Sequence, residues 1–249
     1  MDIWKFYDIT HRKHTLMNPM SPHRFETLCK LLELKPGSRV LDMACGKGEF
    51  IVRLAELYGA SGTGVDISPY FIKECLAKKE RRVPASDLKF IEMDGSEFKP
   101  DPSEPYDLAI CLGATWIYGD FRRTAHSMGS MVKPGGLVIV GDAFWQGDPP
   151  EDYLKETGAK REDFAHDYRD NIDIGEEEGL APLFNMVSSK DDWDLYETLK
   201  WWCADDYARY NPGDSDVPEL LERDRKGREL YLKLERDIVG WCIYVFRKK

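Results

Sequence analysis

Short apolar runs alternate with amphipathic segments from residue 39 to residue 142, and this alternation constrains the fold more than any other feature. Apolar residues three and four positions apart predict helices between the runs, and the runs have the length of buried strands. Strands that alternate with helices form parallel βαβ units, which assemble into a doubly wound α/β sheet. The expected helices are 21–34, 49–57 and 68–80, and the expected strands here are 39–43, 62–67, 88–93, 106–112 and 136–142.

The remainder of the chain has a different character. Residues 146–236 are acidic, rich in aromatic residues and mostly helical by pattern, except for a strand-like run at 181–188, and the chain closes on a clear strand at 240–247. Because there is no internal repeat and no low-complexity linker, we expect a single domain over 1–249. Its expected parts are an N-terminal cap (1–35), a ligand-binding core (36–145), a helical insertion on the substrate side (146–236) and the last strand (237–249).

Charge and cysteine content limit the expected partners. The net charge of −10 argues against a nucleic-acid partner, because phosphate binding needs Lys and Arg concentrated on one face. The chain starts without a secretory leader pattern, and no apolar run reaches the roughly 18–20 residues that span a bilayer. The six cysteines are scattered with no C-x-x-C pair, which predicts reduced thiols and no metal site. We therefore expect a cytoplasmic protein with no membrane partner.

A glycine-rich loop follows the first strand in the sequence VLDMACGKGEF, residues 40–50. The dinucleotide fingerprint is G-x-G-x-x-G, but Ala44, Gly46 and Gly48 leave its third glycine missing. Asp42 ends the strand, and a carboxylate there would repel a pyrophosphate, whereas it suits a cationic group such as an amine. The loop thus favours a different adenosine cofactor, and a dinucleotide-dependent oxidoreductase is the alternative.

Polar or small residues also end the next three strands. Asp66 stands where an acid accepts the hydroxyls of a ribose, and Asp94, followed by Gly95, stands where a carboxylate accepts from an adenine amino group. Gly113 and Ala114 are small enough for a ligand to lie close to the backbone. Each of these residues alone is more often a turn former, but their joint order indicates a cofactor site along one edge of the sheet.

The chain resembles the class I S-adenosylmethionine (SAM) dependent methyltransferases, and within them the small-molecule group that includes the ubiquinone and menaquinone biosynthesis enzymes. The segments that carry the resemblance are VLDMACGKGEF, GTGVDIS, FIEMDGSEF, YDLAICLGATW and MVKPGGLVIVGDAFW. It covers 35–145 and the last strand, and it departs from the usual D-x-G-x-G-x-G at Ala44. It implies SAM as cofactor and a Rossmann-like, seven-stranded sheet, mostly parallel with an antiparallel last strand, under a helical lid.

The resemblance also implies a role for each strand end. Asp42 and the glycine loop would surround the amino and carboxylate groups of the methionine moiety, where Gly113 also lies. Asp66 would hold the ribose, Ile67 would pack on the adenine face, and Asp94 would accept from the adenine amino group. The expected cofactor-binding residues are Asp42, Ala44, Cys45, Gly46, Gly48, Asp66, Ile67, Asp94, Gly95 and Gly113.

The substrate side is less defined by the sequence. The methyl group of SAM is already activated, so orientation supplies much of the rate, and we assign no catalytic residue. The residues that follow the fourth and fifth strands are substrate candidates: Thr115, Trp116, Tyr118, Asp142 and Trp145. Packing under the inserted helices is an equal alternative for the two tryptophans, and a strand-end cap is favoured for Asp142.

Two further segments have two interpretations each. Tyr7, His11 and His14 either fold over the cofactor or lie at the surface, and the surface is favoured for each histidine. The aromatic segment 191–210 forms either a pocket wall or a core helix, and the core helix is favoured. Residues 217–238 are expected to form a long charged helix whose inward face carries Leu220, Leu221, Leu230 and Leu234. The sequence LGATW after the fourth strand lacks the Asn/Asp-Pro-Pro-aromatic motif used on nucleic-acid bases, so we expect a small-molecule acceptor. A non-catalytic SAM-binding regulatory protein is the second alternative.

Overall fold

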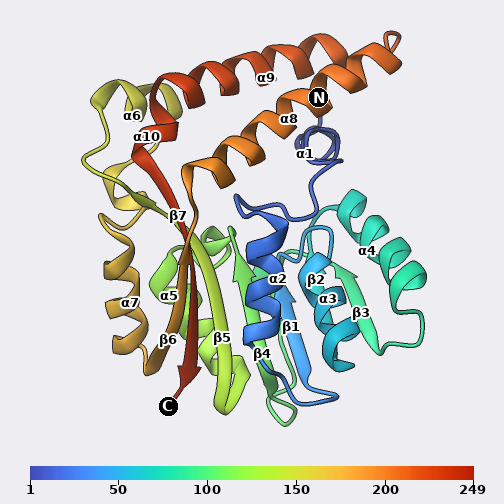
Figure 1. The fold of residues 1–249 in the computed structure, drawn as a ribbon, viewed down its shortest axis with the longest axis vertical. Helices are drawn as coiled ribbons and strands as arrows, with labels where there is room; N and C mark the ends of the chain where they lie inside the picture. Colours follow the sequence, from blue (N-terminus) through green and yellow to red (C-terminus); the bar gives the residue numbers. More distant parts are fainter.

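The computed structural model describes all 249 residues, and its centre is one seven-stranded sheet in the order β3-β2-β1-β4-β5-β7-β6 (Figure 1). The strands are β1 (Arg39–Met43), β2 (Ser61–Asp66), β3 (Leu88–Glu92), β4 (Tyr106–Leu112), β5 (Val132–Trp145), β6 (Leu180–Val187) and β7 (Val239–Lys248). Strands β1 to β5 pair in parallel, and β7 runs antiparallel between β5 and β6. The predicted fold class is therefore confirmed, including the antiparallel last strand.

The strand order reverses at β1, because β2 and β3 extend to one side of it and β4 and β5 to the other. In doubly wound sheets, the crevice at such a reversal lies outside the carboxyl ends of the strands and holds the ligand. This places the ends of β1 and β4, at Met43 and Leu112, at the centre of the candidate site.

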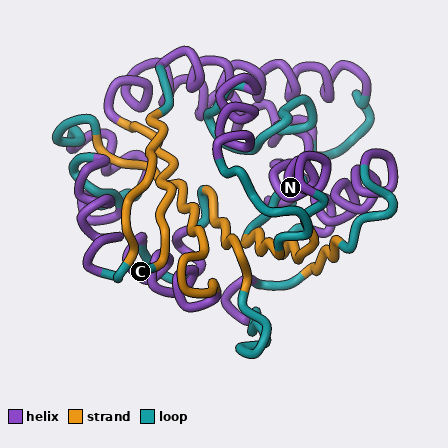
Figure 2. Tube along the Cα trace, turned by 60° about the horizontal axis from the view of Figure 1, so that its bottom comes forward, coloured by secondary structure: helices purple, strands orange, loops and turns teal.

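Helices cover both faces of the sheet. One face carries α2 (Pro22–Leu31), α3 (Glu49–Tyr58) and α4 (Pro69–Arg82), and the other carries α5 (Phe121–Met131) and α7 (Tyr168–Glu177). Phe25 of α2 meets Phe50 of α3 edge to face, with ring centroids 5.2 Å apart, inside the larger apolar cluster. On the opposite face, Phe121 of α5 packs on Tyr244 of β7 at 5.1 Å. The sheet is thus held between two apolar layers, and Figure 2 shows its strands as one orange band with helices around it.

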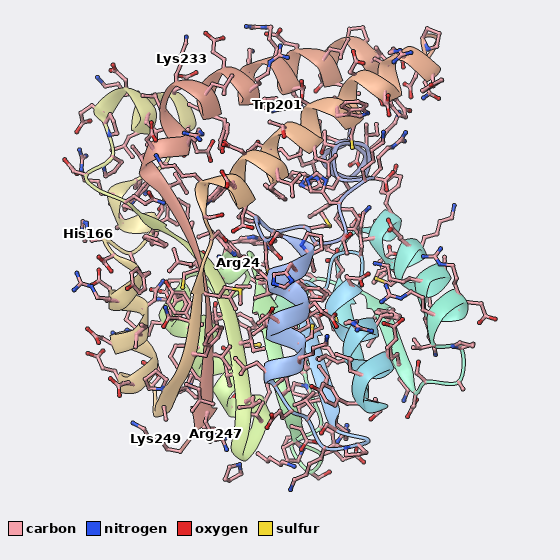
Figure 3. The ribbon with its side chains drawn as sticks, in the orientation of Figure 1. Arg24, His166, Trp201, Lys233, Arg247 and Lys249 are labelled. Atoms are coloured by element: carbon pink, nitrogen blue, oxygen red, sulfur yellow. The ribbon has the colours of Figure 1, made fainter.

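Two helices far apart in the sequence form a roof over the carboxyl ends of the parallel strands: α1 (Ile3–Thr10) and α8 (Lys190–Tyr210). The long helix α9 (Val217–Leu230) packs along α8, and Trp201 lies between them in Figure 3, 6.2 Å from the ring of Tyr231. The ammonium group of Lys5 on α1 bonds Asp214 and Asp216 ahead of α9, at 2.8 and 2.7 Å. The N-terminal segment is therefore fixed to the C-terminal helices.

The region expected to be a helical insertion contributes to the sheet as well as to the roof. Besides α8 and α9 it contains α6 (Glu151–Thr157), the short η3 turn (Arg161–Asp163), α7 and β6, and β6 is the edge strand beside β7. The strand-like run at 181–188 is confirmed as β6. No helix is long and apolar enough to cross a membrane.

Two elements differ most from the expected ranges. Strand β5 begins at Val132 instead of 136, because its Lys133–Gly136 turn forms a register shift against β4. The expected helix 217–238 ends at Leu230 and continues as a π-helical turn η4 (Tyr231–Glu235) and the short α10 (Arg236–Ile238). The π turn brings Tyr231 and Arg236 to one carboxylate, since both donate to Asp194 at 2.7 Å.

The inward face expected for that helix is partly wrong. Leu220 is fully buried, and Leu230 and Leu234 pack against the larger core cluster, but Leu221 is 41% exposed. Consecutive residues of a helix face different directions, so Leu221 lies away from the buried direction of Leu220.

Candidate active site

A cavity of about 480 Å³ opens at the carboxyl ends of β1 to β4, under the roof formed by α1 and α8. Thirteen of its twenty lining residues are hydrophobic. The twenty lining residues come from the glycine loop, from the ends of the three neighbouring strands and the segments that follow them, from the first 18 residues and from α8. A smaller hollow of about 50 Å³ shares Met17, Asn18, Ala44, Gly46 and Leu112 with this cavity and extends it to Asp42.

The glycine loop between β1 and α3 folds through three residues in the left-handed region, Ala44, Gly46 and Gly48, with φ of 53°, 52° and 67°. Ala44 and Gly46 line the cavity, and Cys45 lines the adjoining hollow. Gly48 does not line either space. A Cβ at Gly48 would lie 2.8 Å from the Sγ of Cys75 and 3.1 Å from Phe90, so this glycine allows α3 to pack closely on its neighbours.

Asp66 at the end of β2 holds the loop in place. Its Oδ2 accepts the N–H of Gly46 at 2.8 Å and its Oδ1 accepts the N–H of Ser68 at 2.9 Å. Burial raises the pKa of this carboxyl above its usual value, although the two amides oppose the shift. Each carboxylate oxygen has a second lone pair, so the group retains acceptor capacity toward the cavity that it lines.

Asp42 is buried beside the smaller hollow, and its Oδ2 has no hydrogen-bond partner. Burial and the neighbouring Asp66 carboxylate raise the pKa of Asp42 to about 8. An unpaired buried oxygen costs free energy, so a donor from a ligand would satisfy it. A ligand ammonium group would supply both the missing hydrogen bond and the positive charge that keeps Asp42 ionised.

The remaining predicted cofactor residues lie around the same cavity. Asp94 is exposed at its rim, and its Oδ1 accepts from the N–H and Oγ–H of Ser96 at 2.8 and 2.7 Å. Gly95 lies at the cavity wall, where a Cβ would meet Met43 at 2.7 Å. Ile67 is 38% exposed although it is apolar, so part of its side chain is free to pack against a flat ring of a ligand. Gly113, with φ of 74°, also lines the cavity.

The predicted substrate residues separate into two groups. Trp116, on the short helix η2 (Thr115–Ile117) after β4, lines the cavity and is 63% exposed. Thr115 and Asp142 are buried against each other, because Thr115 Oγ1 donates to Asp142 Oδ2 at 3.0 Å. Burial raises the pKa of Asp142 to about 7, and the bond from Thr115 opposes this shift. The pair fixes η2 to the end of β5, which agrees with the strand-end role favoured for Asp142.

Tyr118 and Trp145 also lie outside the cavity. The Tyr118 hydroxyl is buried without a partner, and its ring packs on the apolar cluster beneath α5. Trp145 is 1% exposed, its Nε1 donates to the carbonyl of Arg161 at 2.9 Å, and its ring packs on Phe164 at 4.9 Å. The structure therefore places Trp145 beneath the segment that follows β5, which is the packing alternative.

The preference for surface histidines in the N-terminal segment is wrong. His11 is 3% exposed and His14 8% exposed, because α8 covers both. His11 Nε2 lies 2.8 Å from the hydroxyl of Tyr196, and His14 Nε2 lies 2.9 Å from the Tyr196 carbonyl oxygen. The rings of the two histidines are 4.9 Å apart.

Both alternatives for the segment 191–210 hold in part, since Tyr196 lines the cavity while Cys203 is buried.

Several lining residues are marked by no sequence motif and were not predicted. They are Ile3, Trp4, Met17, Asn18, Val65, Phe71, Leu112 and Ile117. Trp4 and Tyr7 both lie in the first seven positions. Aromatic side chains this close to the start of the chain were a signal that the N-terminal segment covers an apolar surface. Lys47 inside the glycine loop is a second omission, since its side chain is 2% exposed and pairs with Glu74 at 3.1 Å.

The strand order, the glycine loop and the acids at successive strand ends define a Rossmann-like protein built for an adenosine cofactor. A family model described as a methyltransferase domain matches residues 40–136. The SAM-dependent methyltransferase of Thiobacillus denitrificans, solved with S-adenosyl-L-homocysteine, is 30% identical, with complete coverage of both chains and a TM-score of 0.89. The corresponding Geobacter sulfurreducens structure, also with S-adenosyl-L-homocysteine, is 29% identical with a TM-score of 0.90, covering 100% of this chain and 99% of that one.

A shorter match, 30% identical over 112 residues, links the core to the demethylmenaquinone methyltransferase of Lysinibacillus sphaericus, across 44% of this chain and 46% of that protein. The chain belongs to the SAM-dependent methyltransferases. The predicted family, enzyme class and SAM cofactor are thus confirmed, and the dinucleotide alternative is not supported.

Proposed function

We propose that this chain transfers a methyl group from SAM to a small, uncharged and mainly apolar acceptor bound between the glycine loop and the roof. The observation that carries the proposal is the composition of the cavity wall. It contains no Lys or Arg, while its charged residues are Asp66 and Asp94. The cavity wall therefore offers no cation to an anionic acceptor, and only the sulfonium of the cofactor would offset the cost of desolvating it.

The acceptor side of the cavity is built from aromatic and aliphatic side chains. Ile3, Trp4 and Tyr7 come from the N-terminal helix, and Trp116 and Ile117 come from the turn after β4. Ile3, Tyr7 and Trp116 are between 37% and 63% exposed although they are large and apolar. Exposed apolar side chains gathered at the mouth of one cavity indicate a ligand with apolar surface.

The residues present support a cofactor site in this cavity. Asp42 would pair with the ammonium group of the methionine moiety, which its unpaired Oδ2 supports. Asp66 would accept from the ribose hydroxyls, Ile67 would pack on the adenine, and Asp94 would accept from the adenine amino group. Backbone atoms of Ala44, Cys45, Gly46, Gly95 and Gly113 would complete this set, and Gly48 would contribute only through packing.

When bound, SAM supplies a methyl group activated by its sulfonium charge. The residues of the chain then have to hold the acceptor in line behind that methyl group and exclude water. The roof would contribute to both, because Ile3, Trp4 and Tyr7 of α1 and Tyr196 of α8 line the cavity.

Calorimetry tests the proposal in two steps. The first step compares S-adenosylhomocysteine with NAD, and we expect binding of S-adenosylhomocysteine alone. The second step adds 2-naphthol or 2-naphthoate to the protein saturated with S-adenosylhomocysteine. We expect the neutral naphthol to bind and the anion of matched size not to bind. Tighter binding of 2-naphthoate would overturn the proposed acceptor class.

A further inference from the structure

We propose that His11 and Tyr196 act together as the proton acceptor of this site, and that the acceptor molecule is therefore methylated on a hydroxyl oxygen. The inference rests on the proposed function and extends it to the acceptor atom. Both side chains line the cavity, one from the end of α1 and the other from α8. They are the only residue pair of the cavity wall joined by a side-chain hydrogen bond between a ring nitrogen and a hydroxyl, at 2.8 Å.

The contacts of His11 define which ring nitrogen is free to accept. Its Nδ1 lies 3.1 Å from the carbonyl oxygen of Tyr7, which can only accept, so Nδ1 carries the proton. The hydroxyl of Thr10, 3.0 Å from the same nitrogen, donates to the carbonyl of Phe6 and can accept from His11. His11 Nε2 then presents its lone pair to the Tyr196 hydroxyl. A neutral imidazole fixed in one tautomer is the arrangement required of a general base.

Burial, with a smaller contribution from nearby charges, keeps His11 neutral. Burial lowers the pKa of His11 well below its usual value, and the nearby cations of Lys200 and Lys47 and the ring of His14 add to this effect. Lys200 lies 5.2 Å above the ring of Tyr196 on the same helix. Burial raises the pKa of the Tyr196 phenol, so its proton is held until His11 takes it. The Tyr196 hydroxyl therefore carries its proton, and the Nε2 atom of His11 is unprotonated and able to receive it.

The proposed step couples methyl transfer to proton transfer. The acceptor oxygen forms a bond to the methyl carbon, and the sulfur–methyl bond breaks with its electron pair remaining on sulfur. The acceptor hydroxyl gives its proton to the Tyr196 oxygen, while the Tyr196 proton moves to His11 Nε2. The positive charge leaves the sulfonium and appears on the imidazolium, which releases its proton to solvent afterwards. The acceptor oxygen becomes strongly acidic as it is methylated, so a weak base such as His11 is sufficient.

A purely structural role is the competing explanation, because the same hydrogen bond joins α1 to α8. His14 offers a matched control. It is also buried, and it also bonds α8 through the Tyr196 carbonyl, but it does not line the cavity. A purely structural role predicts the same consequences for loss of either histidine. A proton-accepting role predicts that only the loss of His11 lowers the reaction rate.

The experiment uses the full chain with SAM and 2-naphthol as the probe. The variants His11→Gln, Tyr196→Phe and His14→Gln are compared for the maximal rate of 2-methoxynaphthalene formation. Their melting temperature and their affinity for S-adenosylhomocysteine and 2-naphthol are measured in parallel. We expect His11→Gln and Tyr196→Phe to lower the maximal rate by about 10²–10⁴-fold with affinities retained, the usual contribution of general-base catalysis. We expect His14→Gln to lower the melting temperature without this loss of rate.

The pH profile of the maximal rate gives a second readout. We expect the wild-type rate to be level at neutral pH and to fall only in acid, below the ordinary pKa of histidine, as His11 becomes protonated. The acid limb should be missing in His11→Gln. Equal maximal rates for His11→Gln and His14→Gln, or an acid limb that survives in His11→Gln, would overturn the inference. So would a wild-type protein that binds S-adenosylhomocysteine and methylates 2-naphthylamine but not 2-naphthol, and that result would leave the proposed function intact.

Discussion

The ammonium group of Lys47, inside the glycine loop, donates to the backbone carbonyl of His11 at 2.9 Å. This bond joins the loop that contacts the cofactor to the segment that covers it. Lys47 also pairs with Glu74 on α4 at 3.1 Å, and its side chain is 2% exposed. A buried cation with two partners fixes three elements at one point, so closure of the roof depends on the glycine loop.

Substitution Lys47→Met should loosen this closure. Methionine keeps the apolar stem but removes the charged hydrogen bond and the ion pair, which we expect to destabilise the fold by about 1.5–3 kcal/mol. Amide hydrogen exchange should accelerate in residues 3–14, and the affinity for S-adenosylhomocysteine should fall. Lys13→Met is the matched control, because Lys13 pairs with Asp206 at an exposed position where ion pairs contribute little. Equal exchange rates in the two variants would contradict the coupling.

Asp94 and Asp101 provide an internal comparison for the adenine assignment. Each accepts the N–H and the Oγ–H of a serine two residues later, at 2.8 and 2.7 Å in both cases. Only Asp94 lines the cavity. We expect Asp94→Ala to raise the Kd for S-adenosylhomocysteine by about two- to tenfold, as for loss of one hydrogen bond, and Asp101→Ala to leave it unchanged.

Calorimetry of both variants checks the comparison. Similar melting temperatures are expected, since the two turns are locally alike. An unchanged Kd for Asp94→Ala, or an equal loss for Asp101→Ala, would contradict the adenine role.

Binding of the cofactor should release a proton from Asp42. With its pKa raised to about 8 by burial, this carboxyl is mostly protonated at neutral pH when the site has no ligand. An ammonium group beside it favours the ionised form and lowers that pKa. Titrations with S-adenosylhomocysteine at pH 7 in buffers of different ionisation enthalpy should show proton release. The affinity should rise as the pH increases toward the pKa of Asp42.

Asp42→Asn should abolish the proton release and weaken binding at pH 8. The same group affects stability, with the sign set by its raised pKa. Because the folded pKa exceeds the unfolded value of about 3.8, the stability of the ligand-free protein should fall as pH rises from about 4 to about 8. Proton uptake on binding, or release that persists in Asp42→Asn, would contradict the assignment.

Ala44 is the non-glycine residue of the loop at a left-handed position, with φ of 53°. Such a conformation costs an L-residue about 1–2 kcal/mol, which exceeds the entropic cost of introducing glycine. Ala44→Gly should therefore stabilise the protein by about 1 kcal/mol or less. Ala55→Gly, inside α3, should destabilise it by about 1 kcal/mol or more, since it loses helix propensity and a buried methyl group. Urea unfolding of both variants tests the opposite signs.

The sheet could be predicted because each strand contains a short run rich in apolar residues, although β5 and β7 extend beyond the predicted runs to 14 and 10 residues. The seven predicted strands all exist, and the largest difference is the start of β5 at Val132. The π turn after Leu230 was not predictable in the same way. It depends on the carboxylate of Asp194, which is 37 residues from Tyr231 and becomes its neighbour only after α8 and α9 pack.

The cofactor side of the site was predictable because strand ends meet at one edge of a parallel sheet. Nine of the ten predicted residues line the cavity or the adjoining hollow, and Gly48 lies behind the loop. The acceptor side was predictable only in part. Trp116 was a candidate because it follows a strand, but the other residues come mainly from the N-terminal segment and from α8, which no local pattern joins. His11 shows the difficulty, since its burial depends on Tyr196, 185 positions away.

A crystal structure of the complex with S-adenosylhomocysteine and 2-naphthol would show the cofactor, the acceptor oxygen and the proposed proton acceptor together. We expect the amino group of the cofactor beside Asp42, its ribose on Asp66, and its sulfur directed to the space before His11 and Tyr196. It also predicts the naphthol oxygen within hydrogen-bond distance of the Tyr196 hydroxyl. A cofactor bound with its sulfur facing away from the α1–α8 roof, or a naphthol oxygen remote from both His11 and Tyr196, would contradict it.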